Sequence, residues 1–132
     1  MVDDLMVQQQ LKAPHKRWKH MVAVMCLNLT YRKHVKIILP KLFKRYPTPE
    51  AYLRGRLRTQ QEMLKSLGMW EVRSKRLRKM TEQYLTWNKK EASDLHGIGK
   101  YGSDSYQIFF HDHIPPNVED KELKKYIDKL LG

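Results

Sequence analysis

The sequence has one cysteine, few acidic residues in its first half and no long apolar run. A single cysteine, Cys26, excludes an internal disulfide and a metal site built from several cysteines of this chain. No window approaches the apolar length of a membrane span, and residues 1–10 lack the basic region and apolar run of a signal peptide. Alternating Val, Ile and Thr runs are also missing, so no strand is predicted. We expect a soluble, intracellular, helical protein with Cys26 reduced in its core and no membrane partner.

Positive charge is abundant and unevenly placed. Residues 11–79 contain 19 of the 26 Lys and Arg residues but only three acidic residues, which is a net charge of +16. The rest of the chain carries −4. The total of +12 exceeds the magnitude of about 2 to 8 that is usual for a small domain. This excess favours nucleic acid as the partner, ahead of an anionic membrane surface or an acidic protein.

Apolar residues at helical spacing run through most of the chain. Residues 17–29 predict a buried helix, and residues 32–46 predict a second one that Pro40 should bend or interrupt. A third helix starts at Thr48, the expected N-cap, with Pro49 in its first position.

Two further helices follow. Thr59 and Glu62 form the capping-box pattern of a fourth helix, which Gly68 closes. A basic helix is predicted over residues 70–86, and its inward stripe consists of Trp70, Leu77, Met80 and Tyr84 or Leu85. The pattern is typical of one all-α domain with short connections.

The stretch LHGIGKYGSDSY, residues 95–106, has the composition of a tight connection between two helices. Gly97 and Gly99 permit positive φ angles and a close approach to the backbone, and Ile98 can anchor the turn in the core. The N–H groups that open the next helix attract an anion, for which a phosphate is the natural candidate. A purely structural turn is the competing interpretation, and Lys100 with the basic excess favours the phosphate site.

This stretch resembles the helix-hairpin-helix motif of the DNA glycosylase superfamily that includes endonuclease III, with its hairpin at about residues 91–111. Most of all, the chain over residues 8–130 resembles the glycosylase domain of the methyl-CpG-binding-domain thymine glycosylases. Motifs in the same order and at similar spacing are WK at 18–19, LNLT at 27–30, YP at 46–47, LKSLG at 64–68, RSK at 73–75, EQYLT at 82–86 and EDKELKKY at 119–126.

The resemblance implies a fold, an activity and a setting. The fold would be a two-lobed all-α glycosylase domain over residues 1–132, with DNA lying across a cleft. The activity would be removal of thymine or uracil opposite guanine from double-stranded DNA by base flipping, in base excision repair. We therefore expect a monomer that acts in the nucleus.

Asp120 matches the catalytic carboxylate of that family. Cleavage of the N-glycosidic bond passes through an oxocarbenium-like sugar, which a carboxylate close to C1′ stabilises. Asp104 is the other candidate near the hairpin, and its competing interpretation is a structural charge that favours the dipole of its helix. The competing interpretation of Asp120 is an ordinary acidic residue at the start of the last helix.

Tyr101 stands where strand-cleaving members of the family have a Schiff-base lysine, so the resemblance implies a monofunctional enzyme. We expect Tyr101 to contact the flipped pyrimidine, with a buried core tyrosine as the alternative. Gln10, or Gln8 if the alignment shifts across the QQQ run, matches the glutamine that reads the flipped base. A simple exposed glutamine is the competing interpretation.

Two positions near the expected DNA surface differ from the family. Leu29 replaces the arginine wedge, so it can fill the vacated stack but loses phosphate contacts. Met69 replaces the plug leucine, and backbone groups near Leu29 and Leu67 are expected to read the opposite guanine. The hairpin is expected to contact DNA through His96, Gly97, Ile98, Gly99, Lys100 and Gly102.

No cofactor or metal is expected, although the resemblance allows a monovalent cation on the hairpin carbonyls. His111 and His113 have no further ligand cluster beside them, so a solvated loop is the preferred interpretation. A noncatalytic helix-hairpin-helix DNA-binding module is the alternative function. A basic protein that binds acidic partners or membranes is a third.

Overall fold

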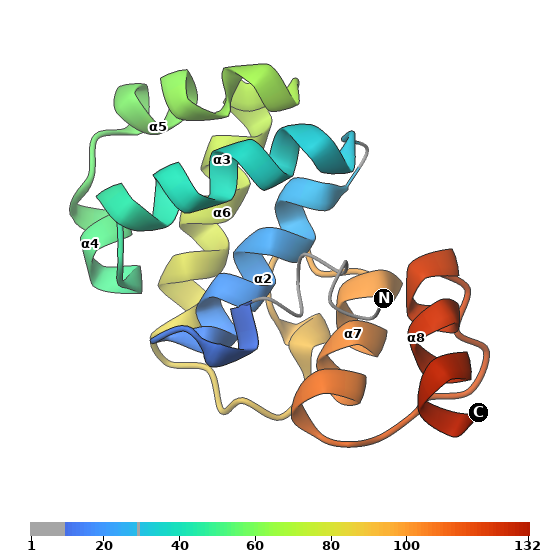
Figure 1. Ribbon diagram of the computed structural model, residues 1–132. Coiled ribbons are helices and arrows are strands. Elements are labelled where there is room, and N and C mark those ends of the chain that lie inside the picture. The colour runs from blue at the N-terminus through green and yellow to red at the C-terminus, as the bar shows by residue number, and fades with distance from the viewer. Residues whose placement is uncertain (1–9, 29) are drawn as a thin grey trace.

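The computed structural model describes residues 10–28 and 30–132, and this part of the chain is all helical, as the sequence predicts (Figure 1). No helix in it is both long and apolar enough to cross a membrane. Its elements are η2 (Gln10–Lys12), α2 (Lys16–Leu27), α3 (Arg32–Arg45), α4 (Pro49–Arg54), α5 (Leu57–Leu64), η3 (Lys65–Leu67), α6 (Trp70–Tyr84), η4 (Ala92–Asp94), α7 (Lys100–Phe110) and α8 (Lys121–Leu131).

Helix α2 is the central element, as its apolar sequence predicts. Every residue from Trp18 to Cys26 is buried, and the helix packs against α3, α6 and α7. Helices α3–α6 lie on one side of it, and α7 and α8 lie on the other, which forms the two lobes (Figure 1). Cys26 is a free, fully buried thiol whose pKa burial raises to about 12, so it is the core residue that was expected.

Polar bonds join α2 to both lobes. On one side, Trp18 Nε1 donates to Thr81 Oγ1 of α6 at 3.1 Å. On the other, the His20 ring nitrogen Nε2 and Ser105 Oγ of α7 are 2.9 Å apart and both residues are fully buried. A smaller apolar cluster then attaches α8 to α7 through Ile108, Leu123 and Ile127.

One predicted helix start agrees with the structure, whereas a predicted interruption does not. The Thr48 side chain accepts from the backbone N–H of Ala51 at 3.0 Å, which confirms the predicted cap. Pro40 lies inside α3 without interrupting it, because it sits on an exposed face where water can reach the freed carbonyl.

The predicted start of the fourth helix is wrong. α5 begins at Leu57, and Thr59 lies inside its first turn instead of capping it. The reason is tertiary: the buried Gln60 side chain donates to the carbonyl of Tyr52 at 2.7 Å, which holds this turn against α4. Gly68, with φ 75°, does end the helical stretch as expected.

Helix α6 buries a guanidinium in addition to the predicted apolar stripe. Leu77 and Met80 are buried, and Trp70 and Tyr84 pack against the core, but Leu85 is 47% exposed and lies outside the stripe. Arg73, which the sequence pattern does not place inside, is only 7% exposed.

The Arg73 guanidinium closes the C-terminal end of α2. It donates to the carbonyls of Met25 at 3.0 Å, Cys26 at 3.4 Å and Asn28 at 3.0 Å, which are left over where the helix ends. It also donates to Thr30 Oγ1 at 2.8 Å and to the Gly68 carbonyl at 3.2 Å. One side chain therefore holds two loops and a helix end together.

We expect Arg73→Met to lower the free energy of unfolding by about 3 kcal/mol or more, because several buried carbonyls lose a charged donor. Urea denaturation followed by circular dichroism measures the change. Arg76→Met is the matched control, since Arg76 is exposed on the same helix. Equal stability of the two variants would show that the loops do not depend on Arg73.

Candidate active site at the hairpin

The glycine-rich connection is a tight turn that is anchored in the core. Gly97 has φ 81°, and Ile98 is buried as predicted. Gly99 has φ −99°, so it does not use the positive φ that glycine permits. The helix expected before Leu95 is only the short η4, and the Gln83 side chain of α6 fixes the turn by accepting from the His96 N–H at 2.6 Å.

Close packing explains one further glycine of the motif. A Cβ on Gly102 would lie 2.8 Å from both Ile98 Cγ2 and Val24 Cγ1, so a larger residue would push α7 away from α2. Gly102 is therefore required for helix packing, and its predicted contact with DNA stays a prediction.

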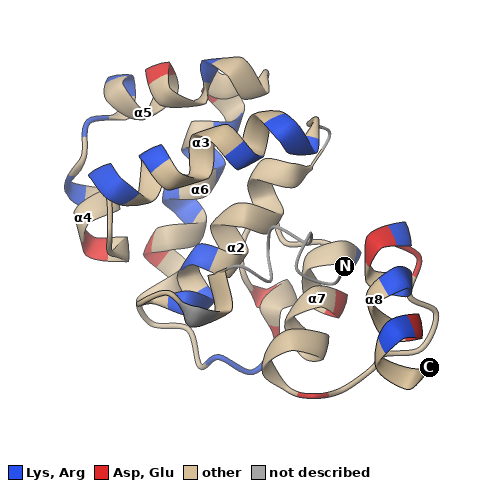
Figure 2. Ribbon diagram, in the orientation of Figure 1, with Lys and Arg blue, Asp and Glu red and all other residues tan. Residues whose placement is uncertain are grey.

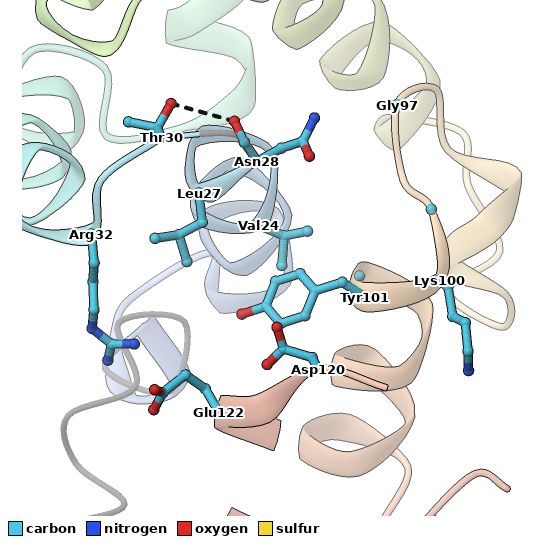
Figure 3. A pocket seen from close by; sticks show the side chains of 12 residues that line it. Val24, Leu27, Asn28, Thr30, Arg32, Gly97, Lys100, Tyr101, Asp120 and Glu122 are labelled. Atoms are coloured by element: carbon cyan, nitrogen blue, oxygen red, sulfur yellow. Dashed lines mark hydrogen bonds between the residues drawn. The ribbon is translucent and has the colours of Figure 1, made fainter. Parts of the chain in front are cut away.

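A cavity of about 570 Å³ lies beside this turn (Figure 3). Its walls come from the end of α2, the start of α3, the hairpin and the start of α8. The lining residues are Val24, Leu27, Asn28, Thr30, Arg32, Gly97, Gly99, Lys100, Tyr101, Gly102, Asp120 and Glu122. This volume is in the range of sites that enclose a small molecule or one nucleotide base.

Asp120 and Tyr101, the two residues predicted to act on the substrate, meet in this cavity (Figure 3). Asp120 is the N-cap of α8, where its Oδ2 accepts from the Leu123 N–H at 2.9 Å. Burial raises the pKa of Tyr101, and the nearby Asp120 carboxylate raises it further. The phenol therefore stays protonated at neutral pH and can donate a hydrogen bond.

Lys100 contributes to the cavity wall, but its ammonium is engaged elsewhere. Its Nζ lies 2.9 Å from Asp104 Oδ2, one turn along α7, and the Asp104 side chain is only 9% exposed. Figure 3 shows the Lys100 side chain directed away from Asp120. Asp104 is not among the lining residues of the cavity, so it has a partner of its own and no place in the site.

Two charged residues of the cavity were missed from the sequence. Arg32 opens α3, and Glu122 lies in the first turn of α8. Both line the cavity with Asp120, although they are about 90 residues apart. Arg32 lies in no motif, and the EDKELKKY stretch that contains Glu122 does not mark it as a cavity residue, because only the folded chain brings the two side chains to one cavity.

The expected plug, Met69, follows Gly68, whose carbonyl Arg73 holds. Leu29 falls outside the described residues. Met69 is 55% exposed and has φ 46°, a backbone conformation that is uncommon for a residue other than glycine. The Leu67 carbonyl accepts from Thr30 Oγ1 at 3.1 Å, so one of its two lone pairs is already used within the protein. The roles of all three in DNA contact stay predictions.

The remaining predicted residues lie apart from the cavity or on its rim. Gln10 begins η2 and is not among the lining residues of the cavity, and Gln8 lies outside the described residues. His96 is partly exposed on the turn, and burial followed by two nearby cations lowers its pKa. His111 and His113 are exposed, and the described part of the chain contains no group of three or more metal-ligating side chains.

Basic residues lie mainly on one lobe. Figure 2 shows Lys and Arg recurring along α3, whereas α8 carries basic and acidic residues side by side. Part of the positive charge is internal: Arg78 donates to the carbonyls of Leu53 and Gly55 at 3.1 and 2.9 Å, and Arg73 is buried. The remaining cations form the surface that can attract a polyanion.

Comparisons with known proteins find the same fold. The chain is 29% identical over 119 residues to a methyl-CpG-binding domain protein 4-like protein of Arabidopsis thaliana, covering 88% of this chain and 26% of that protein. A non-covalent endonuclease III–DNA complex matches with TM-score 0.65 and 18% identity over 76% of this chain and 49% of that one. A thermostable thymine-DNA glycosylase matches with TM-score 0.64 and 19% identity over 84% of this chain and 58% of that one.

These matches confirm the helix-hairpin-helix glycosylase fold that the sequence motifs suggest. The chain spans about a quarter of the plant relative and about half of the two solved chains. No family model matches it.

The two hairpin glycines should respond differently to a methyl group. Gly97→Ala should cost about 1–2 kcal/mol of stability, because alanine disfavours the left-handed φ and its Cβ would lie 2.8 Å from Met25 Cε. Gly99→Ala should stay within about 0.5 kcal/mol, because φ is negative and nothing lies within 4 Å. Thermal melting of both variants checks the pair.

Gly99→Ala also tests the hairpin as a DNA contact. Since nothing in the free protein requires glycine there, a loss of duplex affinity in this stable variant would come from the DNA side. Fluorescence anisotropy with a labelled duplex should show weaker binding by several-fold. Unchanged affinity would mean that DNA does not approach the backbone at this position.

Proposed function

Because the chain has the fold of the helix-hairpin-helix DNA glycosylases, we propose that it is a DNA glycosylase that excises thymine or uracil mispaired with guanine. The observation that carries the proposal is the meeting of Asp120 and Tyr101 in one cavity beside the hairpin. The name of one similar solved structure, a thymine-DNA glycosylase, supports the choice of base.

The proposed chemistry assigns separate tasks to the cavity residues. A base extruded from the duplex enters the cavity with its sugar next to Asp120. The carboxylate stabilises the positive charge that develops at C1′ and orients the water that attacks it. The protonated Tyr101 hydroxyl donates a hydrogen bond to an acceptor on the base.

We further propose that the enzyme is monofunctional, leaving an abasic site without cutting the strand. Tyr101 has no amine, and Lys100, its neighbour in the chain, is ion-paired with Asp104, one turn along α7. A Schiff base with the sugar needs a free amine that reaches C1′. We expect no nick in the product strand until alkali is added.

We expect Asp120→Asn to reduce single-turnover excision by about 100-fold or more, since the charge beside the sugar is removed. Stability should change by less than about 0.5 kcal/mol, because asparagine caps a helix as well as aspartate does. The assay uses G·T, G·U and matched duplexes, with and without alkali. Thermal melting of the variant accompanies it.

Asp120→Ala is the companion variant, because it removes the cap as well as the charge. It should lose about 1 kcal/mol of stability in addition to activity. If Asp120→Asn excises as fast as the unchanged protein, the residue is only a helix cap. If the unchanged protein itself excises no base, the chain is better described as the alternative, a noncatalytic DNA-binding module.

Affinity for undamaged duplex should fall by about two to three orders of magnitude between about 50 and 200 mM salt, because neutralised phosphates release counterions. Anisotropy titrations at several salt concentrations give the slope. A flat response would argue against DNA as the partner and favour an acidic protein. The salt series is independent of catalysis, so it separates DNA binding from glycosylase activity.

A further inference from the structure

One nitrogen of the Arg32 guanidinium is left without a partner in the part of the chain that the structure describes. Arg32 is the first residue of α3, and Figure 3 shows its side chain reaching toward the part of the cavity formed by Tyr101, Asp120 and Glu122. Its Nη2 nitrogen is buried and, within residues 10–28 and 30–132, has no hydrogen-bond partner. Buried polar groups are normally paired, so an unpaired donor inside a cavity indicates an acceptor that arrives from outside.

The placement of Arg32 is also unfavourable for a purely structural cation. The N-terminal end of a helix carries partial positive charge, so an arginine in the first turn of α3 is repelled by the helix dipole. No ion pair joins Arg32 to a carboxylate of the described residues. This wall of the cavity is therefore positive, while Asp120 and Glu122 make the facing wall negative.

That polarity matches the charge that develops when a glycosidic bond breaks. As the C1′–N1 bond cleaves, its electron pair stays on N1 and spreads to the O2 and O4 oxygens of the pyrimidine, while the sugar becomes cationic. Water then adds its oxygen to C1′, and N1 takes up a proton, so that sugar hydroxyl and free base result. A carboxylate near the sugar and a cation near the base stabilise the two halves.

We propose that Arg32 donates to a carbonyl oxygen of the extruded pyrimidine and stabilises the negative charge on the departing base. The inference deepens the proposed function and rests on it. It requires a base that has a carbonyl oxygen as acceptor, and thymine and uracil both have one. Arg32 is then a catalytic residue for the leaving group, and Asp120 serves the sugar.

The test compares two leaving groups in the unchanged protein and in Arg32→Gln, a variant that keeps a donor but loses the charge. Thymine and 5-fluorouracil opposite guanine are excised under single-turnover conditions. Fluorine already stabilises the anion of the second base. Arg32→Gln should therefore slow thymine excision by about 10- to 100-fold and 5-fluorouracil excision by less than about threefold.

Two control variants show whether the slower excision comes from the loss of any positive charge or from altered packing at position 32. Lys124→Gln removes one exposed positive charge from α8 outside the cavity and should leave both rates unchanged. Arg32→Lys should restore part of the thymine rate, which a packing role would not predict. Equal losses on both bases, or no loss on either, would overturn the proposal.

Binding separates this inference from the proposed function. A duplex with 2′-fluorothymidine opposite guanine resists cleavage, so preference for it over a matched duplex reports base capture without chemistry. If the unchanged protein prefers it and Arg32→Gln does not, the Arg32 contact stands even where no excision is found and the glycosylase proposal fails. If excision is normal and Arg32→Gln keeps the preference and both rates, only the Arg32 proposal fails. If the unchanged protein neither prefers this duplex nor excises, both are overturned.

Discussion

The structure depends on the contact between Arg73 of α6 and the C-terminal end of α2. Helix carbonyls that lack an intrahelical partner must be satisfied, and here one buried guanidinium satisfies several of them. The same side chain reaches Thr30 Oγ1 and the Gly68 carbonyl, so the loop after α2 and the turn before α6 share one anchor. Because Thr30 also donates to the Leu67 carbonyl, the two loops are fixed to each other as well.

The second constraint positions the hairpin against the same helix. Gly102 lets α7 approach Val24 of α2, and the His20–Ser105 contact holds the two helices together in the core. Gln83 fixes the turn from α6. The loop after α2 and the hairpin, which form two walls of the cavity, are therefore both held in place by contacts with α2. A shift at the C-terminal end of α2 would move the loop relative to the hairpin that carries Tyr101.

Local signals in the sequence predicted the elements that local interactions determine. The apolar run of α2, the Thr48 cap, the left-handed Gly97 and the buried Ile98 each follow from the residues concerned. The Thr59 cap is wrong because a tertiary bond from Gln60 sets where α5 begins. Local chemistry cannot reveal such a bond.

The cavity could be predicted only in part for the same reason. Asp120 and Tyr101 were found through motif resemblance, and their meeting in space agrees with it. Arg32 belongs to no motif, and Glu122 lies in the EDKELKKY stretch without any mark of a role in the cavity. The two residues reach one cavity only in the folded chain, where α8 attaches to α7. Arg73 was visible only as part of an RSK motif, and its inward direction contradicts the usual exposure of arginine.

The basic and acidic parts of the sequence form different parts of the fold. The basic stretch supplies α3, α5 and α6, and Figure 2 shows Lys and Arg positions recurring along α3. The acidic remainder supplies the hairpin and α8, and with them both carboxylates of the cavity. Under the proposed function, Asp120 approaches the sugar of a phosphate polymer that repels it, so it needs cations nearby. In that proposal the basic lobe offsets the repulsion without neutralising Asp120, because its exposed charges lie outside the cavity. Lys100, the cation nearest to Tyr101 in the chain, is held by Asp104, which leaves Arg32 as the guanidinium that faces Asp120 among the lining residues of the cavity.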